Sequence, residues 1–295
     1  IALPGYLLLS VLGQGGMGTV FLALQQRLQR HVAVKMLHPG IAANQLLNER
    51  LEREAKTLAN LSHPNIVACH DIVHSDGNTF VIMEYVPGRL SVRDIIRRLG
   101  AVPEALAVKI VREAAYGLAY AHEKGIVHRD IKPDNLLLVC EDEITEDDPA
   151  LLFSQVSSRV MIVDFGIAKG EAMFEGSPEV TREGMIMGSP AYMAPEQALN
   201  TKSVDFRADI YALGATLYHM LSGETPFDSD SPLSSVRKKM EQDLPDPRKA
   251  GANVSVQCMA LLRTMTARAP EDRHGSYASL ISALDHLVSL HDSSG

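Results

Sequence analysis

The chain has few cysteines, and those it has lie far apart. Its 295 residues include only Cys69, Cys140 and Cys258. The number is odd, and no pair of cysteines or cluster of cysteine and histidine has the spacing of metal ligands. This excludes a disulfide framework and a zinc site of that kind. We therefore expect reduced thiols, as in cytosolic proteins.

Long apolar runs and a basic excess are also missing. No run approaches the ~18 residues of a transmembrane helix, so we expect no membrane contact within this segment. Residues 1–13 are too short for a signal peptide and lack its basic start. Because the first residue is Ile1, we expect a processed or excised piece. We expect a cytoplasmic location, with a membrane tether in a longer protein as an alternative. The net charge of −8 argues against nucleic-acid binding, which needs a basic face.

The composition is that of a folded protein, since 46% of the residues are hydrophobic, enough for a buried core. Strand-like runs come first, bounded by glycine or polar residues, at 6–13, 19–24, 31–37 and 78–85. A single helix with leucines on one face is predicted among them, at about 44–60.

Helices predominate after Pro87 and Gly88. The pattern predicts one helix over 101–125, with Pro103 near its start and Gly125 at its end, and an apolar, buried helix over 209–223. We therefore predict an α+β fold with a small antiparallel β-sheet lobe over 1–86 and a larger, mainly helical lobe over 87–295.

A glycine-rich loop joins two of the strand-like runs. Gly13, Gly15 and Gly18 stand in the segment GQGGMG, and glycines let a backbone fold tightly over phosphates and point N–H groups at them. The G-x-G-x-x-G pattern is weak alone, because dinucleotide sites share it. A dinucleotide fold needs a helix after the glycines, whereas residues 19–24 are strand-like. The context favours a hairpin lid over ATP.

A strand lysine and a helix carboxylate form a second candidate group. Ala33 and Lys35 share one face of their strand, so Lys35 is expected to face whatever Ala33 covers. Glu54 falls on the apolar face of its helix, between Leu51 and Leu58. A carboxylate there needs a partner, and Lys35 is the candidate. The alternative is an ordinary surface carboxylate.

The segment HRDIKPDNLL (128–137) is the strongest single signal. It is charged, Pro133 interrupts any helix, and it stops at an apolar run. We interpret it as a rigid loop that presents side chains. Asn135 and Asp164, which follows a second apolar run, supply hard oxygen ligands suited to Mg²⁺. Each alone could be a turn residue.

In this order, the motifs resemble those of the eukaryotic-type (Hanks-type) serine/threonine protein kinases over nearly the whole chain. GQGGMGTV is similar to the glycine-rich loop, VAVK to the strand-lysine motif, HRDIKPDN to the catalytic loop, DFG (164–166) to the metal motif and APE (194–196) to the end of the activation segment. GQGGMG and SPAYMAPEQ are most similar to bacterial members. The resemblance implies the bilobal protein-kinase fold and an enzyme that transfers the γ-phosphoryl group of Mg·ATP to protein serine and threonine hydroxyls. The resemblance implies ATP and Mg²⁺ as cofactors, with Mn²⁺ as the alternative metal.

The resemblance also implies roles for single residues. Asp130 would accept or orient the hydroxyl proton, Lys132 would contact the γ-phosphate as in the Ser/Thr branch, and Asn135 would act with them. Asn135 and Asp164 would hold the metal. The expected nucleotide-binding residues are Gly13, Gln14, Gly15, Gly16, Gly18, Val20, Ala33, Lys35, Glu54, Met83, Glu84, Val86, Leu137 and Asp164. Among these, Met83 matches the gatekeeper and residues 84–86 the hinge.

Other matches are architectural or regulatory. Glu196 and Arg273 match a buried ion pair, and Asp209 matches an aspartate that braces the catalytic loop. The matches to internal spine residues are Leu58, His128, Phe165 and Cys69. Ser189 matches a hydroxyl that bonds the catalytic aspartate.

Arg129 matches an arginine that binds a phosphorylated activation segment. We expect autophosphorylation at Thr181, with self-association as a route to it; an absence of phosphate on both Ser177 and Thr181 after incubation with ATP would contradict this. Glu183 stands where relatives often carry a second phosphorylatable threonine. A partial mimic of a phosphorylated residue is one interpretation, and a surface glutamate without a role is the simpler one.

The chain departs from the family between Asn135 and Asp164, which are separated by 28 residues (136–163). The segment 141–148 has six acidic side chains in eight residues, and we expect a solvated loop between two short strands, with substrate steering as the lesser alternative.

Three other functions are alternatives for this sequence. A nucleotide-binding pseudokinase or scaffold would lack a catalytic residue, and none is lost. Small-molecule phosphotransferases typically lack APE and the Glu196/Arg273 pair. The hairpin context of the glycines argues against a dehydrogenase.

Overall fold

A computed structural model describes residues 3–15, 18–38, 58–88, 90–140, 156–165, 190–199, 204–229 and 231–293. These residues divide into two compact units between Val86 and Pro87. The predicted limits of the two lobes include residues outside these ranges and stay predictions. Within the described ranges, no helix combines the length and apolar character needed to cross a membrane.

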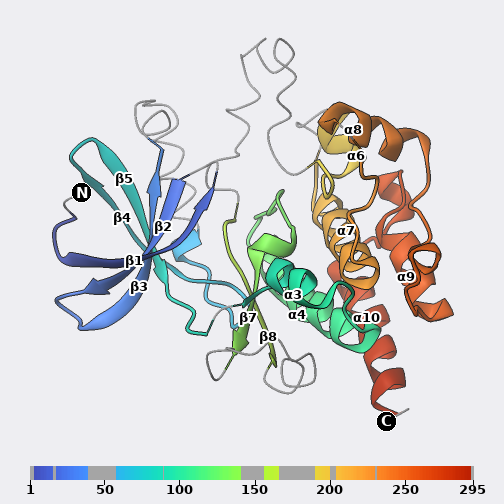
Figure 1. Ribbon diagram of the computed structural model, residues 1–295, viewed down its shortest axis with the longest axis horizontal. Helices are drawn as coiled ribbons and strands as arrows, with labels where there is room; N and C mark the ends of the chain where they lie inside the picture. The colour runs from blue at the N-terminus through green and yellow to red at the C-terminus, as the bar shows by residue number, and fades with distance from the viewer. Residues whose placement is uncertain are drawn as a thin grey trace. The chain divides into compact units, whose positions relative to one another are not determined.

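The first unit is a five-stranded antiparallel sheet with the order β1-β2-β3-β5-β4 (Figure 1). Its strands are β1 (Tyr6–Gly15), β2 (Gly18–Gln25), β3 (Arg30–Leu37), β4 (Cys69–Ser75) and β5 (Asn78–Glu84). Four of them confirm the predicted strands. The strand β4 was not predicted; it is an edge strand whose sequence CHDIVHS has only intermediate or exposed residues. Edge strands pack on fewer neighbours, so their apolar pattern is weak.

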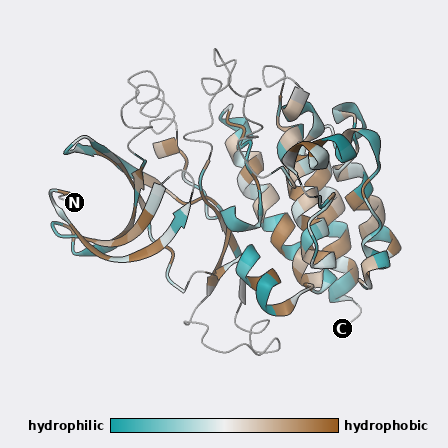
Figure 2. Ribbon diagram, turned by 45° about the horizontal axis from the view of Figure 1, so that its top comes forward, coloured by the Kyte–Doolittle hydropathy of each residue, from teal (hydrophilic) through white to brown (hydrophobic). Residues whose placement is uncertain are grey.

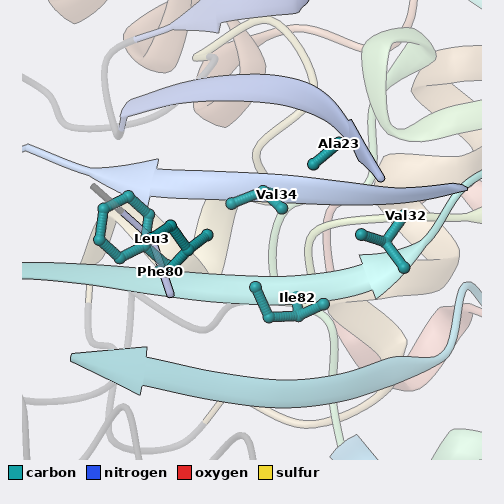
Figure 3. Close-up of a cluster of buried hydrophobic side chains, with 6 residues drawn as sticks. All are labelled: Leu3, Ala23, Val32, Val34, Phe80 and Ile82. Carbon is teal, nitrogen blue, oxygen red and sulfur yellow. The ribbon is translucent and has the colours of Figure 1, made fainter. Parts of the chain in front are cut away.

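The two faces of this sheet carry different clusters, because successive side chains of a strand point to opposite faces. Val32 and Val34 pack on one face with Phe80 and Ile82, and Leu3 and Ala23 complete that cluster (Figure 3). Ala33 lies on the other face, with Val81 and Met83. The predicted alternation along β3 is confirmed.

The second unit is mainly helical and holds one small sheet, β6-β7-β8. Its helices are α3 (Val92–Leu99), α4 (Glu104–Glu123), α6 (Pro195–Leu199), α7 (Arg207–Ser222), α8 (Pro232–Glu241), α9 (Val256–Met265) and α10 (Tyr277–Asp292). The strands are β6 (Leu90–Ser91), β7 (Leu136–Cys140) and β8 (Val156–Ile162), and 3₁₀ turns lie at Pro133–Asn135, Pro247–Ala250 and Pro270–Asp272. Figure 2 shows hydrophobic residues in the strands of both sheets. The α+β fold class is confirmed.

Both predicted helices of this unit are present, as α4 and α7. Pro103 occupies the N-cap position of α4, and Gly125 follows the helix with a φ of +75°. The helix α7 ends at Gly223, whose φ of +74° is left-handed. A side chain at Gly223 would also meet the Gly100 carbonyl oxygen at 2.8 Å. Every residue of α7 from Ala208 to Leu221 is buried, as expected for a helix that is mostly apolar.

The two strands expected on either side of the acidic insert are β7 and β8, with Leu136 opposite Ile162. This pairing brings the end of the catalytic-loop motif close to the start of the metal motif. Cys69 and Cys258 are free thiols, as predicted for them.

Candidate active site

A buried carboxylate on α7 holds the loop that contains Asp130. Asp209 is 1% exposed, and its two oxygens accept the backbone N–H groups of His128 and Arg129, each at 2.7 Å. Burial raises the pKa of the Asp209 carboxyl, while these two donors favour the ionised form. The loop is therefore fixed just before Asp130 by a charged group inside the second unit.

His128 links this loop to the segment before Asp164. Its Nδ1 accepts the backbone N–H of Asp130 at 3.2 Å, so Nδ1 carries no proton. The proton therefore lies on Nε2, which donates to the Val163 carbonyl at 3.0 Å. The imidazole is fully buried and stacks at a tilt on the Phe165 ring, 4.6 Å between centroids. The neutral tautomer thus ties two loops together.

Two polar side chains, those of Asn135 and Lys132, converge on Asp130. The Asn135 amide donates to the main-chain oxygen of Asp130 at 2.8 Å and approaches its carboxylate at 3.4 Å. The Lys132 ammonium lies 3.2 Å from the same carboxylate oxygen. The side chains of Asp130 and Lys132 are 14% and 21% exposed. The result is a partly exposed carboxylate in a fixed orientation with a cation beside it.

Asp164 lies next to this group through the backbone. The Val163 N–H donates to the Asn135 carbonyl at 3.0 Å, so Asp164 directly follows a residue anchored on Asn135. Asp164 and Arg129 both have left-handed backbone, with φ values of +59° and +63°. Such conformations cost about 1–3 kcal/mol in non-glycine residues and cluster at functional sites.

The first unit carries the candidates for nucleotide binding. Lys35 is 8% exposed and pairs in register with Val20 on β2 and Val81 on β5. Ala33 and Met83 face each other across β3 and β5, each 9% exposed. Together with the half-buried Val20, they form an apolar surface beside a buried lysine.

The glycines of the loop differ in what requires them. A Cβ on Gly18 would lie 2.0 Å from the Met36 carbonyl oxygen, so the close approach of β2 and β3 requires glycine there. A Cβ on Gly13 or Gly15 would meet no protein atom within 4 Å. Packing in the described residues does not require glycine at these two positions. A ligand that approaches the backbone would require it.

The segment after β5 is held by Glu84. Its backbone N–H donates to the Ala68 carbonyl at 2.9 Å, and its carboxylate accepts the Ala68 N–H at 3.2 Å. Val86 is buried, at 4% exposure. Leu137 on β7, in the second unit, is also buried.

A buried ion pair joins the end of the activation segment to the region before α10. Arg273 and Glu196 form two parallel hydrogen bonds, of 2.6 and 2.8 Å. The Arg273 side chain is fully buried and also donates to the carbonyls of Ala267, Arg207 and Arg268. All five donors of the guanidinium are used.

The sequence matches the family described as "Protein kinase domain" over residues 6–286. This chain belongs to the protein kinase family. It is 36% identical over 279 residues to the serine/threonine-protein kinase PknB of Mycobacterium leprae, covering 93% of this chain and 42% of that protein. It is 34% identical to the probable serine/threonine-protein kinase CPE1738 of Clostridium perfringens, covering 96% and 38%. The kinase domain thus spans about two fifths of the length of these relatives.

Solved structures show the same fold. The kinase domain of Mycobacterium tuberculosis PknI superposes on this kinase domain with a TM-score of 0.70 and 29% identity, covering 97% of each chain. The resemblance to bacterial members is confirmed by these relatives.

Several predicted site residues of this kinase domain lie outside the described residues. They are Gly16, Glu54, Thr181, Ser177, Glu183, Ser189 and the acidic run 141–148. The pairing of Lys35 with Glu54 and the phosphorylation of Thr181 therefore stay predictions.

Sequence reasoning missed Gln197, which connects the end of the activation segment to the catalytic loop. Its amide nitrogen donates to the Arg129 carbonyl at 3.1 Å, and its amide oxygen accepts the Ala194 N–H at 2.9 Å. A glutamine directly after APE has no pattern that distinguishes it from a surface residue, so no signal in the sequence could have identified it.

Tyr192 was also missed, and it lies in a buried polar chain. Its hydroxyl donates to Nδ1 of His219 at 2.6 Å and accepts from Arg93 at 3.3 Å. Arg93 also pairs with Asp134 of the catalytic loop at 2.9 Å. Burial and the nearby Arg93 charge lower the pKa of His219 to about 4, so this imidazole is a neutral acceptor.

The buried, neutral His219 predicts that the fold is sensitive to acid. Unfolded histidine has a pKa of about 6.5, so below that pH the unfolded state binds a proton that folded His219 does not. The free energy of unfolding then falls as the pH drops from about 6.5 towards 4. Between pH 7.5 and pH 5, we expect the free energy of unfolding to fall by about 1–2 kcal/mol more in the wild type than in His219→Asn. Asparagine keeps an acceptor for Tyr192 but does not titrate. Urea unfolding at both pH values measures the difference, and equal losses would contradict the assignment.

Proposed function

We propose that this chain is a serine/threonine protein kinase that transfers the γ-phosphoryl group of Mg·ATP to protein serine and threonine hydroxyls. Family membership and two relatives with that printed activity support this function. The observation that carries it is the carboxylate of Asp130, fixed by Asn135 and flanked by Lys132. Phosphoryl transfer depends on positioning and on neutralised charge, and this group is built for both.

The proposed roles follow from chemistry. Asp130 orients the acceptor hydroxyl and takes its proton, because it is a carboxylate in a fixed orientation. Lys132, a cation beside it, contacts the γ-phosphate. In the first unit, Lys35 contacts the α- and β-phosphates, with Glu54 as its partner. The adenine is lined by Met83 and residues 84–86. The loop of Gly13 and Gly15 covers the phosphates.

The residues proposed for the metal fit Mg²⁺. The Asn135 amide nitrogen is engaged by Asp130, and within the described residues its Oδ1 atom has no hydrogen bond. Amide and carboxylate oxygens are hard ligands, and Mg²⁺ in kinases takes one or two protein ligands plus substrate phosphates. In keeping with this, the described ranges contain no cluster of three or more His, Cys, Asp or Glu residues that could hold a metal alone. When bound, the metal would neutralise phosphate charge; Mn²⁺ would substitute.

The test is phosphoryl transfer itself. The chain is incubated with γ-labelled ATP and a peptide library with serine, threonine or tyrosine acceptors, with Mg²⁺, Mn²⁺ or EDTA. We expect label on serine and threonine peptides with either metal and at least a 100-fold loss with EDTA, since phosphoryl transfer requires the metal. Nucleotide binding without transfer would favour the pseudokinase, and label on tyrosine alone would contradict the substrate class.

We also propose that the kinase is regulated by autophosphorylation at Thr181, with self-association as the route. Arg129 would bind the phosphorylated Thr181. Phosphopeptide mapping after incubation with ATP tests it, and unphosphorylated Ser177 and Thr181 would contradict it. The cytoplasmic location and a membrane tether stay predictions.

A further inference from the structure

Two adjacent lysines on α8 differ in their surroundings. Lys238 is partly exposed and donates to the Asp228 carbonyl at 2.6 Å. Lys239 is 1% exposed. Its ammonium donates to the main-chain carbonyls of Ala191 and Met193, each at 2.8 Å, and to that of Pro190. It lies over the Tyr211 ring, 5.7 Å from the centroid.

Burying an ammonium group costs free energy unless each of its N–H groups has a hydrogen-bond acceptor. An ammonium has three N–H donors and no acceptor, and here three carbonyl oxygens receive them. Burial opposes the charged form and lowers the pKa of Lys239 to about 7, whereas the carbonyl oxygens favour the charge. Within the described residues no carboxylate pairs with Lys239, so backbone oxygens and the face of the Tyr211 ring compensate its buried charge.

The three carbonyls belong to one short segment, residues 190–193, which is also attached to the catalytic loop. Next to it, Ala194 and Arg129 are joined through Gln197. The catalytic loop has its own supports in Asp209 and Asn135, which do not involve Lys239. The Lys239 contacts thus fix a strip of chain that is connected through Gln197 to Arg129, the residue before Asp130, without holding Asp130 itself.

We propose that Lys239 is a positioning residue for the protein substrate: it anchors residues 190–193 so that the acceptor hydroxyl is presented to Asp130. This inference rests on the proposed function. It predicts that Lys239 affects the use of the acceptor and leaves ATP binding and ATP chemistry unaffected. A purely structural role would reduce all of these together, through the fraction of folded protein.

The experiment compares wild type, Lys239→Met, Lys239→Arg and the matched control Lys238→Met. For each, the KM and kcat for peptide, the KM for ATP and the ATP hydrolysis in the absence of peptide are measured. We expect Lys239→Met to lower peptide kcat/KM by about tenfold to 100-fold, mostly through the peptide KM, because buried charge-assisted hydrogen bonds are lost. The KM for ATP and the hydrolysis rate should stay within about twofold.

Lys239→Arg keeps a charge and donors, so its peptide KM should fall between wild type and Lys239→Met; it also replaces the methionine variant if that fails to fold. Lys238→Met should match wild type. Equal loss of hydrolysis and peptide phosphorylation, or no change in peptide KM, would overturn the positioning role. A wild type that hydrolyses ATP but labels no peptide would instead refute the proposed function.

Discussion

Replacing Asp130 with asparagine is expected to lower kcat for peptide phosphorylation by about 10²- to 10⁴-fold, the usual contribution of a positioned acid or base. Asparagine has nearly the same shape, so the contact of Asn135 with the main-chain oxygen of residue 130 (2.8 Å) remains. It cannot accept a proton, and it removes the negative charge 3.2 Å from the Lys132 ammonium. The loss should therefore appear in kcat and leave the fold in place.

The measurement is kcat at saturating ATP and peptide, with ATP affinity from a binding titration and the melting temperature as a check on folding. We expect ATP affinity to change by less than about fivefold, because the proposed nucleotide contacts are made by other residues. Asp134→Asn is the matched control, since that carboxylate is in the same loop but is 44% exposed and pairs with Arg93. A loss below about tenfold is expected for it. Similar losses of kcat in both variants would show that the negative charge of the loop, and not Asp130 specifically, determines the rate of phosphorylation.

The local patterns of the sequence carried most of the fold. Alternating residues along β3 predicted the faces of Val32 and Lys35. Gly125 predicted the end of α4 and an apolar run predicted α7, each to within a few residues. These features depend on contacts between residues close in the sequence. The short catalytic segment was also readable, because Asp130, Lys132 and Asn135 are local to one loop.

Contacts between distant residues were not readable from pattern alone. Lys239 follows another lysine on a half-exposed helix, which predicts a solvated side chain, yet it contacts carbonyls about 50 residues earlier. Gln197 and Tyr192 are similar cases. The Glu196 and Arg273 pair could be expected only through the family resemblance, since nothing in their local sequence connects them.

Replacing Arg273 with methionine is expected to lower the free energy of unfolding by about 3–5 kcal/mol, the usual cost of breaking a buried ion pair from one side. The change removes two bonds to Glu196 and leaves three backbone carbonyls without their donor. It also removes a cation 4.9 Å from the centre of the Tyr211 ring. Methionine fills part of the volume, so the loss is mainly electrostatic and hydrogen-bonding.

Arg268→Met is the matched control, because Arg268 lies on the same connection between α9 and α10. Its side chain is 50% exposed and its partner Asp243 is 88% exposed, so the expected loss is below about 1 kcal/mol. Glu196→Gln should fall between the two, since glutamine still accepts a hydrogen bond but leaves a fully buried guanidinium without its counter-charge. Urea unfolding of the three variants at pH 7 measures the order. If Arg273→Met and Arg268→Met were equally mild, the Glu196 pair would not stabilise this fold.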